Sequence, residues 1–186
     1  MESQFVSSYP NTLLGDLPFN FPEGTHAIGR LDKHSEGLLL LTTNKKITAL
    51  LFQSKVPHKR TYLVQVRQKM NAESLEKLRT GVSIRIKGGG YYTTPPSDVQ
   101  IVEEPKNLFP SPRNLPPNIE STWLLITLTE GKYHQVRKMV VAVKHRCIRL
   151  IRVSIEDLLL GDLQPGEVKE VNEDFFFSKL KLEANH

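Results

Sequence analysis

The alternation of apolar and polar residues predicts strands and helices interspersed along the chain. Every second side chain in residues 61–67 is tyrosine or valine, and residues 82–86 alternate in the same way, as half-buried strands do. Residues 38–42 form a short apolar run that is typical of a buried strand. We expect further strands at residues 98–102, 122–129 and 148–155.

Asparagine residues precede three segments in which apolar side chains recur every three or four positions. An asparagine at that place can accept a hydrogen bond from the first free N–H groups of a helix, so each is a candidate helix cap. The three are Asn44, Asn71 and Asn172. We expect the second of these helices to stop at Gly81 and the third to run to Lys179. The same periodicity predicts a fourth helix over residues 133–144.

The segments between these elements are rich in glycine and proline. The three glycines at 88–90 favour a hairpin turn, because the Lys-Ser/Thr pair that follows a phosphate-binding glycine loop is missing. Five prolines in residues 103–119 predict an exposed loop, and residues 1–28 are expected to form loops and weak strands. Since strands and helices are interspersed and short turns join several strands, we predict an α+β fold on a largely antiparallel sheet.

The composition is that of a globular protein able to bury a core. Of the 186 residues, 39% are hydrophobic and 24% are charged, which suits one domain or two closely packed subdomains. Cys147 is the only cysteine, so an intrachain disulfide is excluded, and we expect a reducing compartment and a buried structural thiol. No apolar run approaches the roughly 20 residues that span a bilayer. We therefore expect a cytoplasmic protein without membrane contact.

Positive charge is concentrated in one part of the chain. The formal net charge is +5, and residues 130–152 hold seven lysines and arginines against the single acid Glu130. A cluster of this kind is either a footprint for phosphates or a solvated helix face beside a basic strand edge. The charge favours an acidic partner without identifying it.

One acidic side chain stands in an irregular segment flanked by glycine. Asp32 ends the run Gly29-Arg30-Leu31-Asp32, and Ser35-Glu36-Gly37 leads from it into the apolar run at 38–42. Rigid scaffolds often present catalytic groups on such loops. An aspartate before serine and glycine is, however, commonly a turn or cap residue. Both interpretations stay open on these residues alone.

Tyr62 stands near the start of a strong strand, in the run Lys59-Arg60-Thr61-Tyr62. A tyrosine at such a place usually packs in the core or lies half-buried on the sheet. Its ring can also stack on a base extracted from a nucleic acid, with the hydroxyl near the reacting group. The strand pattern by itself does not choose between these roles.

Residues 130–139 run from a glycine turn into the fourth predicted helix. His134, Arg137 and Lys138 share one face of that helix, because they lie three and four positions apart. The face is opposite the apolar side, so it meets either phosphate groups or solvent. The free N–H groups at the start of the helix would also favour a phosphate.

Taken in order, these segments resemble the RsuA/RluE branch of the RNA pseudouridine synthases. The resemblance rests on Gly-Arg-Leu-Asp with Ser-Glu-Gly-Leu-Leu, on Lys-x-x-Tyr, and on Glu-Gly-Lys-x-His-Gln-Val-Arg. Residues 150–153 and 160–167 fit the same branch, so the resemblance covers most of residues 24–171. Residues 93–96 and the proline-rich loop before Trp123 are most similar to the E-type members for the large ribosomal subunit, which act on ribosomal RNA.

The resemblance implies a role for each candidate side chain. Asp32 would be the essential carboxylate, Tyr62 would pack against the target base, and Arg137 would pair with Asp32 in the pocket. The carboxylate would either add covalently to the substrate or remove a sugar proton, and the sequence leaves both routes open. Contacts to RNA would come from six basic side chains: Arg30, Lys59, Arg60, Lys132, His134 and Lys138. The reaction needs no metal and no other cofactor.

The resemblance also implies an architecture and a partner. The fold would be a bent mixed, largely antiparallel sheet with flanking helices and a central catalytic cleft, formed by residues 1–186 as a single catalytic domain of two subdomains. We expect no separate small RNA-binding domain, and an N-terminal edge that begins after the family's usual first strand. The partner would be ribosomal RNA or a pre-ribosomal particle, bound by a monomer. The alternatives are a catalytically inactive RNA-binding module and a ribosome-associated structural protein.

Overall fold

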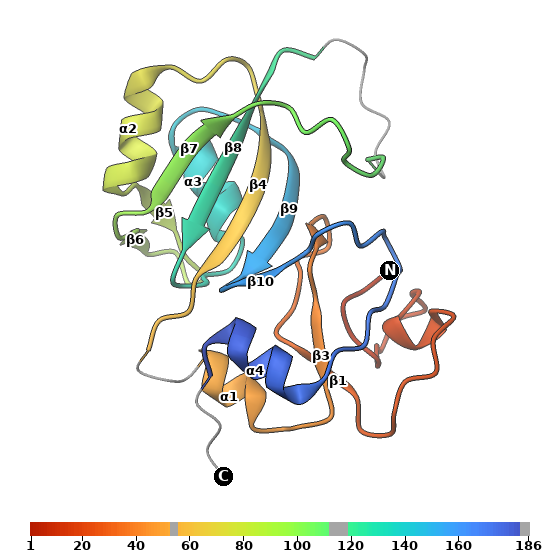
Figure 1. Ribbon diagram of the computed structural model, residues 1–186. Coiled ribbons are helices and arrows are strands. Elements are labelled where there is room, and N and C mark those ends of the chain that lie inside the picture. The colour runs from red at the N-terminus through yellow and green to blue at the C-terminus, as the bar shows by residue number, and fades with distance from the viewer. Residues whose placement is uncertain (53–55, 112–118, 183–186) are drawn as a thin grey trace.

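Three long antiparallel strands form the centre of the structure, a computed structural model that describes residues 1–52, 56–111 and 119–182 (Figure 1). β4 (Arg60–Arg67) lies between β8 (Ser121–Leu128) and β9 (Cys147–Ile155) and is hydrogen-bonded to both. β7 (Asp98–Val102) extends the sheet beyond β8, and β10 (Leu158–Leu159) extends it beyond β9. These strands confirm the predicted antiparallel sheet.

Shorter elements surround this sheet. Two small antiparallel pairs lie apart from it: β1 (His26–Ile28) with β3 (Leu40–Thr42), and β5 (Ser83–Arg85) with β6 (Tyr91–Thr93). The helices are α1 (Ile47–Phe52), α2 (Ala72–Thr80), α3 (Gln135–Ala142) and α4 (Glu173–Leu180), and η1 (Leu14–Asp16) is a single 3₁₀ turn. The β5–β6 pair confirms the hairpin predicted at the three glycines.

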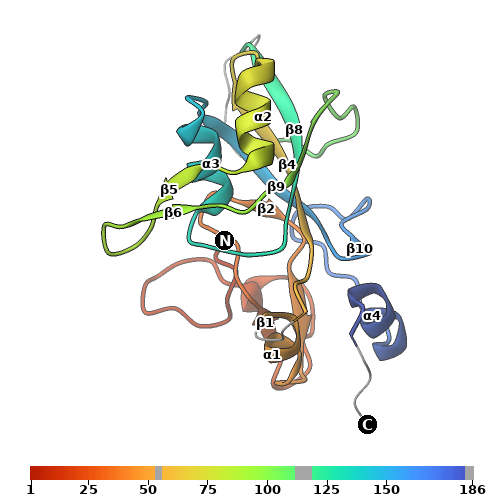
Figure 2. The same cartoon turned by 90° about the vertical axis from the view of Figure 1, so that its left-hand side faces the viewer.

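The main core lies between one face of the sheet and the helices α2 and α3 (Figure 2). Val64 and Ile126 of the sheet are fully buried against Leu78 of α2 and Met139 of α3. The opposite face is also covered, by a cluster around Leu63 and its neighbours. β4 is therefore buried on both sides over much of its length, where the alternating pattern predicted a strand with one exposed face.

A second core lies below the sheet in Figure 1, where β1, β3, α1 and α4 meet. Ile28 and Ile47 are buried there with Leu180 of the last helix. Ile155 at the end of β9 belongs to the same cluster, so this strand joins the two parts of the molecule. The arrangement places the loop between β1 and β3, which contains Asp32, beside the central sheet.

Two of the three asparagine caps are confirmed by hydrogen bonds. The side chains of Asn71 and Asn172 each accept from the backbone N–H of the third residue after them. The side-chain oxygen of Asn44 accepts from the backbone N–H of Lys46, which precedes α1, so Asn44 stabilises the turn before that helix and not its first turn. The predicted helix at 133–144 is shorter, because it begins at Gln135 and ends at Ala142. His134 holds a left-handed backbone (φ 54°, ψ 32°), which an α-helix cannot contain, so the helix begins one residue later.

The loop predicted at 103–119 contains no helix or strand in its described part, while residues 112–118 lie outside the described ranges. None of the helices within the described ranges is long and apolar enough to cross a membrane.

Candidate active site

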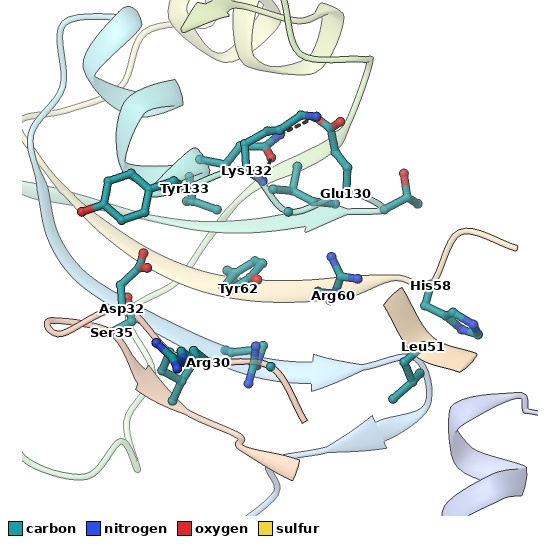
Figure 3. A pocket seen from close by; sticks show the side chains of 18 of the residues that line it. Arg30, Asp32, Ser35, Leu51, His58, Arg60, Tyr62, Glu130, Lys132 and Tyr133 are labelled. Atoms are coloured by element: carbon teal, nitrogen blue, oxygen red, sulfur yellow. Dashed lines mark hydrogen bonds between the residues drawn. The ribbon is translucent and has the colours of Figure 1, made fainter. Parts of the chain in front are cut away.

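A cavity of about 640 Å³ lies where the Asp32 loop, the start of β4, the turn after β8 and β9 meet (Figure 3). Asp32 and Tyr62 both line it, although 30 positions separate them in the sequence. In Figure 3, Asp32 lies at one end beneath the ring of Tyr133, Tyr62 lies at the centre, and Arg60 lies beyond Tyr62. The sequence-predicted carboxylate and tyrosine thus share one cavity.

The Asp32 loop is held in place by backbone hydrogen bonds. The carbonyl of Asp32 accepts from the N–H of Ser35 at 2.8 Å, which closes a turn after the aspartate. The short strand β2 (Glu36–Gly37) then pairs parallel with Ile151 and Arg152 of β9. This pairing was not predicted from the sequence, and it attaches the loop to the central sheet. The carboxylate itself remains one-third exposed.

Tyr62 is half-buried on β4, directly opposite Ile126 of β8 and Arg152 of β9. Side chains of directly paired residues project from the same face of a sheet. Arg60 projects from that face as well, because side chains two positions apart in a strand point the same way. Tyr62 is therefore flanked by two arginines on the floor of the cavity.

Both of these arginines are buried, with 8% of Arg60 and 4% of Arg152 exposed. Burial lowers the pKa of the Arg60 guanidinium, and the interactions with Tyr62 and Glu156 partly offset that shift. Burial also lowers the pKa of Arg152, with Tyr62 and Asp32 acting in the opposite direction and Arg60 adding to the shift. Arginine nevertheless stays protonated at neutral pH. The floor of the cavity consequently carries two positive charges.

Arg152 was not among the predicted pocket residues, although it lies in the predicted strand at 148–155 and in the basic window at 130–152. Its place is set by the register between β4 and β9, in which Arg152 faces Tyr62. A shift of one residue would turn it to the other face of the sheet. The apolar residues around Arg152 predict the strand itself. A single sequence does not give the register between two strands, so the position of Arg152 opposite Tyr62 could not be predicted.

The expected pair between Arg137 and Asp32 is not formed. The Arg137 guanidinium donates to the carbonyl of His34, and its nitrogens lie 3.4 Å from Ser35 Oγ and 3.5 Å from Cys147 Sγ. It lies outside the cavity lining because the first turn of α3 points it toward β9 and the residues after Asp32. Arg137 thus contacts the Asp32 loop without reaching the carboxylate. Cys147 is half-buried, where a buried thiol was expected.

The neighbour that does approach the carboxylate is His134. Its Nε2 lies 3.7 Å from Asp32 Oδ1. The imidazole ring is stacked on the ring of Tyr133, with centroids 3.9 Å apart. Lys138 completes this group, with its ammonium 5.2 Å from the centre of the Tyr133 ring. Sequence-predicted basic residues therefore gather at the mouth of the cavity around an exposed tyrosine.

The other basic candidates are divided between the cavity and its surroundings. Arg30 and Lys132 line the cavity and are exposed. Lys59 is exposed but lies outside the lining, and its backbone N–H donates to Glu156. The basic residues at 130–152 do not all reach the surface either. Arg149 is buried in a bidentate contact with Glu36. The cluster is therefore not one continuous outer face.

The turn after β8 is fixed by a small polar network. The carboxylate of Glu130 accepts from the hydroxyl of Tyr92 and from the side-chain amide of Gln135, each at 2.5 Å. The hydrogen bond to Glu130 raises the pKa of Tyr92. Gln135 in turn accepts from the backbone N–H of Lys132 at 2.8 Å. This network holds Lys132 and Tyr133 at the edge of the cavity.

No cluster of three or more potential metal-ligating side chains occurs in the part of the chain that the structure describes. The described side chains of the cavity instead combine two carboxylates (Asp32 and Glu130), two tyrosines (Tyr62 and Tyr133) and several cations. Such a set can hold an anionic polymer and act on a bond next to the carboxylate.

Comparison with known proteins identifies the family of this chain. A sequence profile described as RNA pseudouridylate synthase matches residues 9–142. Ribosomal large subunit pseudouridine synthase E of Vibrio parahaemolyticus serotype O3:K6 is 42% identical over 171 residues, covering 91% of this chain and 68% of the relative. The protein of the same name from Xanthomonas axonopodis pv. citri is 36% identical over 149 residues, covering 79% of this chain and 76% of the relative.

A solved structure agrees with these relatives. The crystal structure of a pseudouridylate synthase superimposes with a TM-score of 0.70 at 25% identity. The alignment covers 87% of this chain and 63% of that one, so the present chain spans somewhat less than two thirds of its length. The profile, the relatives and the shared fold confirm the resemblance seen in the motifs. This chain belongs to the RNA pseudouridylate synthase family.

Proposed function

We propose that this protein isomerises uridine to pseudouridine in ribosomal RNA, and that the RNA is that of the large subunit. The observation that carries the proposal is that Asp32 and Tyr62 line one cavity, in a chain that belongs to the pseudouridylate synthase family. The relatives named for the ribosomal large subunit support the choice of RNA.

Asp32 is the catalytic carboxylate in this proposal. Isomerisation breaks the bond between sugar C1′ and uracil N1, turns the base, and forms a bond from C1′ to C5. Asp32 either adds to the substrate and is later displaced, or removes a sugar proton to give a glycal-like intermediate and returns that proton to the sugar when C5 bonds to C1′. Both routes need a carboxylate at the sugar and a base removed from the stack. The partly exposed position of Asp32 at the cavity end leaves room for a ribose.

The other two candidate residues bind the base or position the carboxylate. Tyr62 packs against the uracil ring from the cavity floor, next to two buried cations. Arg137 acts through its contacts with His34 and Ser35, and so fixes the loop that carries Asp32. By fixing the loop, Arg137 restricts the positions that the Asp32 carboxylate can adopt. Catalysis needs reacting groups placed to within a fraction of an ångström.

The RNA backbone follows the exposed and half-buried cations around the mouth. Arg30, Lys132, Lys138 and the nearby His134 and Lys59 provide charges for phosphates, which position the RNA without selecting its sequence. We place the reaction in the cytoplasm, on ribosomal RNA or a pre-ribosomal particle, and the protein acts as a monomer.

The test uses ribosomal RNA transcribed with uridine tritiated at C5, because formation of the C1′–C5 bond releases that hydrogen. The wild-type chain is expected to release tritium, and Asp32→Asn to lower the rate by at least about 10⁴-fold, the loss typical of removing a catalytic group. RNA affinity and melting temperature should stay close to those of the wild type. The matched control is Asp98→Asn, at an exposed carboxylate on the edge strand β7, which should keep full activity.

Absence of tritium release from the wild-type chain on both naked RNA and pre-ribosomal particles would contradict the proposal. If RNA binding then persisted, the inactive RNA-binding module would be the better description. If Asp32→Asn stayed active, Asp32 would be removed from the mechanism.

A further inference from the structure

Arg152 leaves one of its hydrogen-bonding groups unused at the floor of the cavity. Its Nε donates to the carbonyl of Leu38 at 2.8 Å. Its Nη2 is buried, and no described residue accepts a hydrogen bond from it. The side chain is only 4% exposed and lines the cavity. A buried guanidinium N–H therefore remains available to a molecule that enters there.

The surroundings of this group are more positive than negative. Arg60 lies on the same face of the sheet and acts on Arg152 as a like charge. Asp32 acts on it as an opposite charge, but that carboxylate is one-third exposed and lies at the cavity end. The close partners of Arg152 are the Leu38 carbonyl and the Tyr62 side chain, and no described carboxylate lies within ion-pair distance of it. A buried cation without an ionic partner is costly to the fold. A cation preorganised in this way can stabilise negative charge on a molecule that binds in the cavity.

The isomerisation creates such a charge, whichever route Asp32 takes. When the C1′–N1 bond breaks, its electron pair leaves with the base, so the detached uracil is an anion. Its charge is shared between N1 and the two carbonyl oxygens. C5 then bonds to C1′ and loses its proton to solvent, while N1 takes up a proton, so atoms and charge balance over the reaction.

We propose that Arg152 donates a hydrogen bond to the detached uracil and stabilises the negative charge that the ring carries between the two bond changes. This inference rests on the proposed function, and it assigns a catalytic residue that the motifs did not. Tyr62, which packs against the base in that function, lies directly across from Arg152 in the β4–β9 register. A ring resting on Tyr62 therefore brings its carbonyl oxygens toward the free N–H of Arg152.

Burial favours the base over a backbone phosphate as the partner of Arg152. Phosphates stay near water when RNA binds, and the exposed Arg30 and Lys132 at the cavity can meet them there. Only the extracted base is expected to reach the buried floor beside Tyr62. The Arg152 contact should then strengthen as the bond breaks, which raises the rate more than the affinity.

The test compares Arg152→Gln with Arg149→Gln. Arg152→Gln removes the positive charge but keeps an amide N–H that can donate a hydrogen bond to the Leu38 carbonyl. Arg149 is the matched control, since it is a buried arginine of the same strand that pairs with Glu36 outside the cavity lining. Single-turnover tritium release, RNA affinity and melting temperature are measured for both variants and the wild type.

Arg152→Gln is expected to lower the single-turnover rate by about 10²-fold or more, the loss typical of one charge-stabilising donor. Its RNA affinity should change by no more than a few-fold. Arg149→Gln should lower the melting temperature, while its folded fraction should lose far less of the rate than Arg152→Gln does. A loss of RNA affinity in Arg152→Gln, with an unchanged rate at saturating RNA, would overturn the inference and indicate a phosphate contact.

A second substrate separates charge stabilisation from a merely structural role. Fluorine at C5 makes uracil a better anion, so it needs less help from Arg152. With 5-fluorouridine at the target, consumption of that nucleoside is followed in nuclease digests, and the ratio of wild-type to Arg152→Gln rates should shrink several-fold. An unchanged ratio would overturn the inference. A wild-type chain inactive on ordinary uridine would instead refute the proposed function itself.

Discussion

His134 Nε2 lies 3.7 Å from Asp32 Oδ1, and the backbone of His134 holds a left-handed conformation. This conformation ends the turn after β8 and directs the imidazole across the cavity mouth, where it stacks on Tyr133. The helix that follows then carries Arg137 away from the carboxylate. The left-handed backbone of His134 thus decides that His134, and not Arg137, lies next to the Asp32 carboxylate.

We expect His134→Asn to slow tritium release by up to about tenfold at low salt. Asparagine tolerates the left-handed backbone, so the fold should persist while Asp32 loses the imidazole that lies 3.7 Å from its Oδ1. The effect is limited because both side chains are about one-third exposed, and exposed pairs contribute roughly 1 kcal/mol or less. At about 1 M salt the difference should shrink through screening. Equal rates at low salt would remove His134 from the site.

We expect Gly37→Ala to destabilise the protein far more than Gly88→Ala. Both glycines have a positive φ, 98° and 95°. A Cβ on Gly37 would lie 2.3 Å from the carbonyl oxygen of Arg152, whereas one on Gly88 would meet no described atom within 4 Å. Gly88→Ala should therefore cost only the backbone strain, about 1–2 kcal/mol. Urea denaturation of the two variants measures the difference.

The same pair of variants tests how the Asp32 loop is attached. Because Gly37 pairs with Arg152 between β2 and β9, its displacement should also lower the rate per folded molecule, while Gly88→Ala leaves that rate unchanged. Similar stabilities for the two variants would show that the close approach of β2 to β9 does not contribute to the stability of the fold.

We expect Lys132→Gln to weaken RNA binding and to reduce its dependence on salt. Each phosphate contact that is lost should lower the slope of log affinity against log salt by about 0.7 for single-stranded RNA. Lys77→Gln is the control, since Lys77 is an exposed lysine of α2 paired with Glu73. Filter binding over a range of salt concentrations should separate the two variants. Identical slopes would place Lys132 outside the RNA path.

We expect Lys181→Met to lower the melting temperature at neutral pH and to have no such effect at strongly alkaline pH. Hydrogen bonds to Asp157 and Glu156 raise the pKa of Lys181. A raised lysine pKa stabilises the fold fully below the ordinary value of about 10.4, and this contribution is lost as the pH rises through the raised value. Melting temperatures of both proteins from about pH 7 to about pH 11.5 should therefore converge. A constant difference would indicate a packing effect.

Local chemistry was enough to predict much of the fold. The caps at Asn71 and Asn172, the stop at Gly81 and the hairpin at residues 88–90 depend on a few neighbouring residues, so the sequence contained them. The strand at 98–102 was predicted with its observed bounds. The helix after His134 was predicted too long, because residues at 133–134 that fit a helical period adopt a turn instead.

For the candidate site, the sequence by itself indicated the candidate residues: Asp32 on its glycine-flanked loop, Tyr62 on its strand, and the cations that follow Glu130. The tertiary structure decided which cation meets which partner. It placed Arg152 beside Tyr62, sent Arg137 to His34, and brought His134 to Asp32. The physical reason is that motifs depend on residue type and local spacing, whereas these contacts depend on the register of β4 against β9 and on the parallel pairing of β2 with β9. Both pairings join residues that lie far apart in the sequence.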